Sequence, residues 1–142
     1  MRAARVAIVF CMAVSTALGS WYLRVRIPEK DWSTSFRAGK EALNLGRFSE
    51  AERHFLAAVE AARAFGEDDR RLADSQFLLA QALVGQARQP DALRALERAV
   101  TIYTKVLGRE HAASAEVEEY YTRLRKATDS SDGPGALPDK TR

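Results

Sequence analysis

The chain has 142 residues, which allows one domain with appendages, and a helical core of about 100 residues is enough to fold alone. The formal net charge is +3, but residues 31–127 hold 15 basic and 15 acidic side chains, so the excess positive charge lies around the N-terminus. This placement gives no sign of nucleic-acid binding, and we expect no nucleic-acid partner. The single cysteine, Cys11, excludes an intramolecular disulfide and a cysteine-based metal cage.

The N-terminus predicts a membrane segment. After the basic start, Val6 to Leu23 form an uncharged run of eighteen residues, which is the lower threshold for crossing a bilayer. Trp21 and Tyr22 end this run, and such aromatic side chains suit the lipid headgroup layer. We therefore expect residues 1–27 to be a signal anchor, with residues 6–23 making a single pass through a bacterial inner membrane.

A cleavable secretory signal is the alternative for the same residues. The small-residue pattern Ala17-Leu18-Gly19 followed by Ser20 describes a cleavage site, and cleavage near Gly19 would leave a secreted or periplasmic protein. A lipoprotein signal at Cys11 is disfavoured because bulky Phe10 precedes the cysteine. Arginines lie on both sides of the apolar run, so the charge distribution predicts no orientation.

From residue 31 to residue 127 the apolar pattern is helical and repeats with a period of 41. The repeated positions in the first helix of each copy are Phe36, Gly39, Ala42 and Leu43 against Phe77, Ala80, Leu83 and Val84. Those in the second helix are Ala51, Phe55, Ala58, Val59, Ala62 and Phe65 against Ala92, Leu96, Ala99, Val100, Tyr103 and Val106. Apolar steps of three and four form one stripe along an α-helix. Small residues at fixed places then let neighbouring helices approach closely.

Residues at the helix ends set the predicted boundaries. Ser49 and Glu52 have the spacing of a capping box, and Pro90 lies where a helix can begin without an amide proton. Gly66 and Gly108 follow the long second helices, where a left-handed residue would stop them.

The sequence therefore predicts an all-α fold of two antiparallel helix-turn-helix units and a C-terminal capping helix, preceded by the transmembrane or signal helix. The predicted helices are residues 33–45, 49–65, 69–86, 90–107 and 112–127. Residues 128–142 are rich in polar residues, glycine and proline, and we expect them to form a disordered tail.

The repeated pattern resembles the tetratricopeptide repeat, in a long form similar to that of kinesin light chains. The resemblance covers residues 31–127, about two thirds of the chain, and rests on the small residue of each first helix, the Leu45–Phe48 turn, the Ala-large-Ala triplet of each second helix and the Leu107–His111 linker. Ala112 replaces the usual proline, Gln89 replaces the aromatic that Phe48 supplies, and only two full repeats are present, whereas arrays usually need about three.

The resemblance implies a protein-interaction scaffold whose groove is lined by the first helix of each pair. The helix face opposite the core stripe carries the candidate partner-binding residues Arg37, Lys40, Glu41, Asn44, Asp74, Leu78 and Gln81. We expect a protein or peptide partner, bound by a membrane-tethered scaffold. The alternative is a secreted module that self-assembles, because two repeats are few and self-association would extend the stack.

Enzymatic and metal-dependent functions have no candidate residues. Glu50 and His54 are four apart on one helix, but a third metal ligand is not evident. Glu67-Asp68-Asp69 precede a helix, where acidic residues favourably meet the helix dipole. The sequence has no glycine-rich phosphate loop and no serine or cysteine nucleophile with a base. We expect no enzyme, no cofactor and no metal.

Overall fold

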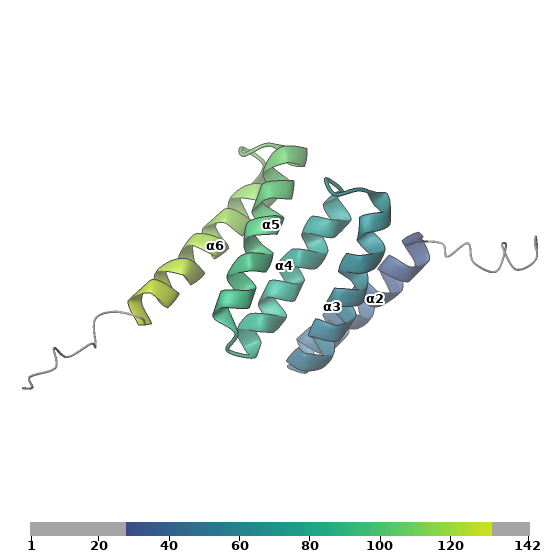
Figure 1. The fold of residues 1–142 in the computed structure, drawn as a ribbon, viewed down its shortest axis with the longest axis horizontal. Helices are drawn as coiled ribbons and strands as arrows, with labels where there is room; N and C mark the ends of the chain where they lie inside the picture. The colour runs from purple at the N-terminus through teal and green to yellow at the C-terminus, as the bar shows by residue number, and fades with distance from the viewer. Residues whose placement is uncertain (1–27, 132–142) are drawn as a thin grey trace, which may run out of the picture.

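The computed structural model describes residues 28–131. These residues form the helices α2 (Pro28–Asn44), α3 (Phe48–Ala62), α4 (Arg70–Gly85), α5 (Gln89–Leu107) and α6 (Ala112–Ser131), and a 3-10 turn η1 (Arg63–Phe65) follows α3. The helices stand side by side in chain order, with α2 and α6 at the two ends (Figure 1). Each helix from α2 to α5 packs against the next one in the sequence. Within residues 28–131 there is no strand, which confirms the predicted all-α fold of two hairpins and a cap.

The outermost helices are longer than predicted. Helix α2 begins five residues early, at Pro28, because a proline in the first turn needs no hydrogen-bond partner for its nitrogen. Helix α6 continues to Ser131, so residues 128–131 of the predicted tail are helical. The remainder of the tail and residues 1–27, including the predicted span 6–23, lie outside the described residues. Between residues 28 and 131, no helix has the length and apolar character that a membrane crossing needs.

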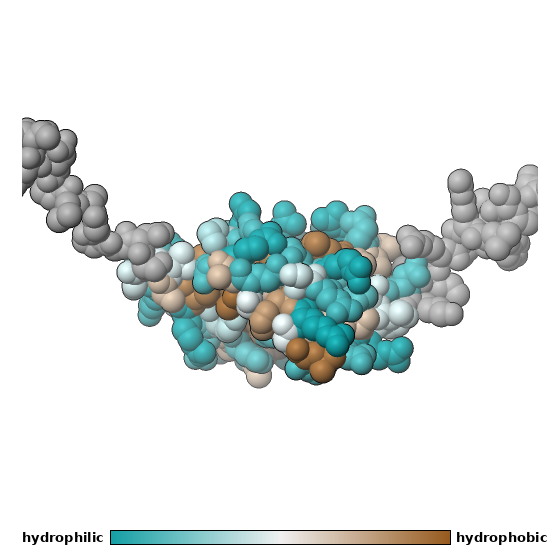
Figure 2. Space-filling model, turned by 90° about the horizontal axis from the view of Figure 1, so that it is seen from below, coloured by the Kyte–Doolittle hydropathy of each residue, from teal (hydrophilic) through white to brown (hydrophobic). Residues whose placement is uncertain are grey.

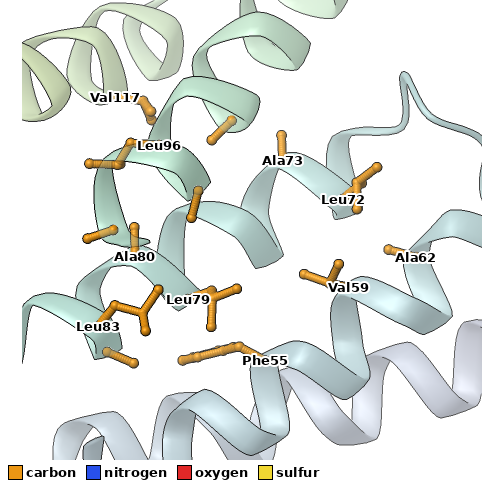
Figure 3. Packing of buried hydrophobic residues seen from close by; sticks show 14 of the residues in the cluster. Phe55, Val59, Ala62, Leu72, Ala73, Leu79, Ala80, Leu83, Leu96 and Val117 are labelled. Atoms are coloured by element: carbon orange, nitrogen blue, oxygen red, sulfur yellow. The ribbon is translucent and has the colours of Figure 1, made fainter. Parts of the chain in front are cut away.

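The core lies along the apolar stripes that the 41-residue period defines. Phe55 and Leu96 are fully buried, one in each hairpin. Val59 and Ala62 of α3 face Leu72 of α4 (Figure 3). Because burying a large apolar side chain contributes roughly 1.5–3 kcal/mol, these contacts hold the helices in place.

A pair of facing residues differs between the two hairpins in a compensating way. Gly39 of α2 lies against the ring of Phe55, and a Cβ atom at position 39 would come within 2.6 Å of Phe55 Cε1. At the equivalent positions of the second hairpin, alanine replaces glycine and leucine replaces phenylalanine, as Ala80 and Leu96, and both are fully buried. The larger residue on one helix is thus matched by the smaller residue on the other, as a close-packed interior requires.

The turns that close the two hairpins have the same backbone geometry. After α2, Gly46 has φ +70°, its nitrogen donates to the carbonyl of Leu43, and Arg47 donates to Ala42. After α4, Ala87 has φ +58°, its nitrogen donates to the carbonyl of Val84, and Arg88 donates to Leu83. These paired bonds form the Schellman motif that ends many helices, normally with glycine in the left-handed position.

The predicted capping box at Ser49 and Glu52 is wrong. Helix α3 begins at Phe48 and its N-cap, Arg47, makes no side-chain hydrogen bond. Ser49 therefore lies inside the first turn, and its hydroxyl donates to Gln86 Oε1 at 3.4 Å. The carboxylate of Glu52 accepts hydrogen bonds from Gln86 at 2.8 Å and from Arg88 at 2.7 Å. Both side chains join the two hairpins instead of capping their own helix.

The two glycines predicted to stop the second helices have positive φ angles, but not the left-handed helical conformation. Gly66 has φ 122° and ψ 159°, and Gly108 has φ 85° and ψ 160°. This region of backbone space is essentially restricted to glycine. Helix α3 ends at Ala62, three residues before the predicted end, and reaches Gly66 through η1. Helix α5 begins at Gln89, one residue before the predicted start, and Pro90 lies in its first turn.

Candidate functional site

Helix α2 carries most of the predicted binding residues on one exposed face. Arg37, Lys40, Glu41 and Asn44 follow helical spacing and are all exposed. Together with Phe36 and Leu45 they line a shallow depression of about 490 Å³. We call these six residues the α2 surface. The structure thus brings the four α2 candidates together around one depression.

The α2 surface combines charge with apolar area. Leu45 is 60% exposed, the highest value among the large hydrophobic side chains described. Phe36 is half-buried, because its ring stacks on Trp32 at 4.9 Å and meets the edge of Phe55 at 6.1 Å. Its remaining exposed area borders the depression. Phe36 is therefore held in place by the core while it contributes to the surface.

The charges of the α2 surface are available to a partner. No ion pair connects Arg37, Lys40 or Glu41 to another described residue, although ion pairs are frequent on the other helices. An unpaired, hydrated surface charge costs little by itself and can meet an opposite charge on a binding partner. The amide of Asn44 adds hydrogen-bond donors and an acceptor to the same face.

The candidates on α4 occupy a different environment. Asp74 accepts a hydrogen bond from the hydroxyl of Tyr103 and lies 3.9 Å from the Arg70 guanidinium. Burial, followed by the bond to Asp74, raises the pKa of Tyr103 well above its usual value, so the phenol remains a donor. Leu78 packs against the core, and Gln81 is half-buried. The depression of the α2 surface includes no α4 residue.

Sequence reasoning missed the apolar part of the α2 surface. Leu45 was assigned to the turn and Phe36 to the core stripe. A signal was present, because Phe36 precedes Lys40 by four residues and therefore lies on the same side of the helix. Half-burial of an edge residue depends on the neighbouring helix, so spacing alone does not reveal it.

The pair considered for metal binding lies beside a smaller depression. His54 Nε2 is 3.9 Å from Glu50 Oε1, and both residues line a depression of about 210 Å³ together with Arg47 and Glu41. Within residues 28–131, no group of three or more histidine, cysteine, aspartate or glutamate side chains is placed to hold a metal ion.

Comparison with protein families finds a match in the repeat region. The family model described as tetratricopeptide repeat matches residues 41–105, from the last turn of α2 through most of α5. The match supports the resemblance drawn from the 41-residue period, so the described helices form tetratricopeptide-like repeats. It does not assign them to the kinesin light chain type. Comparison with curated proteins and with solved structures gives no significant match.

Proposed function

We propose that this chain is a scaffold that binds a partner protein or peptide through the α2 surface. The match to tetratricopeptide repeats supports protein–protein interaction as the class of function. The observation that carries the choice of surface is that the unpaired cations Arg37 and Lys40 flank exposed apolar area at one depression. Apolar contact surrounded by charge is a common arrangement of protein interfaces.

Charge reversal tests the assignment of this surface. The variant Arg37→Glu/Lys40→Glu in the full-length chain removes both unpaired cations. Its control, Arg53→Glu/Arg109→Glu, makes the same change in net charge at two exposed residues outside the α2 surface. Cells are treated with a crosslinker and the captured neighbours are identified by mass spectrometry. We expect the first variant to lose neighbours that the wild type and the control retain, whereas identical neighbour sets would contradict the proposal.

The position of the scaffold in the cell is part of the proposal. The eighteen-residue apolar run 6–23 supports a membrane tether that presents the repeats beside a bilayer. Intact mass of the protein from membrane and soluble fractions tests this. A full-length mass in the membrane fraction is expected, and a soluble product beginning near Ser20 would replace the tether with secretion.

A secreted, self-assembling module is the second candidate. It is favoured by the small number of repeats, because the described residues contain two hairpins and one capping helix, and repeat proteins usually need about three units. Light scattering of the mature protein separates the two functions. Weak self-association would show at roughly tens of micromolar protein. A monomer at this concentration supports the scaffold, and larger species support self-assembly.

A further inference from the structure

A second depression lies away from the α2 surface, between the α3–α4 turn and α5. Its volume is about 660 Å³, within the usual range of ligand pockets. The buried residues that line it are Leu72 and Gln76 of α4 and Ile102 of α5. Charged, exposed residues of the turn and of α5 also line it. We call this depression the α4–α5 groove.

Gln76 distinguishes this groove from an ordinary surface hollow. Its side chain is only 5% exposed, yet no hydrogen bond connects it to another described residue. Buried polar groups almost always have partners, because leaving one without costs roughly 1–3 kcal/mol. Gln76 lines the groove. Its amide atoms are not fully enclosed by the protein, so a molecule in the groove can reach them. The amide offers two donors and one acceptor there.

The chemistry around Gln76 fits a peptide main chain. An amide that both donates and accepts matches the N–H and C=O groups of an extended main chain, which carries one of each per residue. Leu72 and Ile102 are 4% and 8% exposed and provide an apolar contact for a side chain of that peptide. A small apolar molecule would leave the amide without a partner.

The charges of the groove select the sign of the peptide. Three of the six charged residues are neutralised by neighbours: Arg63 bonds Glu60 at 3.2 Å, Arg94 bonds Asp91, and Asp68 bonds Lys105. No ion pair connects the other three to a described residue, and they are Glu67, Glu97 and Arg98. Two unpaired carboxylates against one unpaired cation favour a basic side chain on the ligand over an acidic one.

We propose that the α4–α5 groove is a second binding site, which takes an extended peptide with an apolar residue beside a lysine or arginine. Gln76 bonds the peptide main chain, Leu72 and Ile102 contact the apolar side chain, and Glu67 and Glu97 attract the basic one. This site is separate from the α2 surface in its residues and in the charge of its ligand.

A displayed library of random twelve-residue peptides, selected on the full-length protein, tests the proposal. Each enriched peptide is then measured against the variants Gln76→Leu, Glu97→Gln and Lys40→Glu. Gln76→Leu removes the amide but keeps a side chain of similar size. Glu97→Gln alters only an exposed residue and serves if Gln76→Leu does not fold.

We expect the enriched peptides to carry adjacent apolar and basic residues. Their affinity should fall about tenfold in Gln76→Leu, because one or two hydrogen bonds to the main chain are lost. It should fall a few-fold in Glu97→Gln, because one charge is lost. Lys40→Glu should leave these peptides unaffected, so failure of the α2 surface and failure of this site can be told apart. Enrichment of acidic peptides, or of no peptide sensitive to position 76 or 97, would overturn the proposal and leave a hydrated groove only.

Discussion

Gly39 and Phe55 approach each other closely in the core of the first hairpin. A methyl group at position 39 would come within 2.6 Å of the Phe55 ring, and that ring is fully buried. We expect Gly39→Ala to lower the free energy of unfolding by about 1–3 kcal/mol, the usual effect of overpacking. Urea unfolding followed by circular dichroism measures this.

A second substitution tests whether the pair acts as a unit. Phe55→Leu alone leaves a cavity, but together with Gly39→Ala it reproduces the Ala80–Leu96 pair of the second hairpin. The double variant should therefore be more stable than the sum of the single effects predicts, by about 1 kcal/mol. Simple additivity of the two losses would show that the two positions do not compensate.

At the α4–α5 turn, we expect a substitution at the left-handed residue to stabilise the protein. Ala87 has φ +58° and is exposed, so its side chain makes strain without compensating burial. Replacement by glycine should raise the free energy of unfolding by about 1 kcal/mol. Gly46→Ala is the matched control, because position 46 has φ +70° and nothing within 4 Å of an added Cβ, and it should lose a similar amount. A destabilised Ala87→Gly would contradict this explanation.

Sequence reasoning located some of these special residues and missed others for identifiable reasons. The positive φ angles at Gly66 and Gly108 were anticipated because glycine after a long apolar stripe is a strong local signal. Ala87 carries no such signal, and only the 41-residue offset from Gly46 marks it. The compensation between positions 39 and 55 could not be predicted, because composition does not show which residues face each other.

At the scale of the helices, α6 contains a polar atom without a partner. Ser114 is 1% exposed, and its hydroxyl is the one fully enclosed side-chain atom among the described residues that makes no hydrogen bond. The equivalent position in α4 is Ala73, which is also buried. Ser114→Ala should raise the free energy of unfolding by about 1 kcal/mol, since it removes an unsatisfied group at little cost in packing. A loss of stability in thermal unfolding would mean that the hydroxyl has a partner after all.

The two hairpins are connected at one end by a polar network. Arg88 donates to Asp91 at 2.6 Å and to Glu52 at 2.7 Å. This end of the molecule, with the α2–α3 and α4–α5 turns, is largely hydrophilic with small separate hydrophobic areas (Figure 2). The hydrogen bond from Arg88 lowers the pKa of Asp91, and the bonds to Asp91 and Glu52 raise the pKa of Arg88.

The lowered pKa of Asp91 makes the network sensitive to acid. Its stabilisation is present above the ordinary aspartate pKa of about 3.9 and is lost as the pH falls through the lower folded-state value. The wild type should therefore lose stability more steeply below pH 4 than Asp91→Asn does. Glu118→Gln, at an exposed residue without an ion pair to a described residue, is the control and should follow the wild type. Parallel curves for wild type and Asp91→Asn, from urea midpoints between pH 2 and 6, would contradict the role of this network.

Helix positions could be predicted well from periodicity, and helix ends less well. All five predicted helices are present, because stripes with steps of three and four leave few alternatives. The capping box failed because Phe48 starts α3 one residue earlier and the second hairpin supplies Gln86 and Arg88 as partners for Ser49 and Glu52. Those partners are 34 to 37 residues away in the chain, so a local motif could not reveal them.

At the scale of the whole molecule, helical spacing places four of the six residues of the α2 surface on one helix face. These four residues, Arg37, Lys40, Glu41 and Asn44, line one depression in the structure. Helical spacing could not show that Asp74 is bonded to Tyr103, because that contact joins α4 to α5. The α4–α5 groove was not predicted either. Gln76 interrupts the apolar stripe of α4 four residues after Leu72, but this interruption alone does not indicate a groove.

The most direct test of the account is site-specific photocrosslinking from the α2 surface in cells that express the full-length chain. A photoreactive amino acid replaces Lys40, and in a matched control it replaces Lys126, which is exposed near the end of α6. We expect a discrete crosslinked product from position 40 that is lost when Arg37 is changed to glutamate, and no such product from position 126. Absence of any product from position 40, or equal products from both positions, would contradict a partner-binding role for the α2 surface.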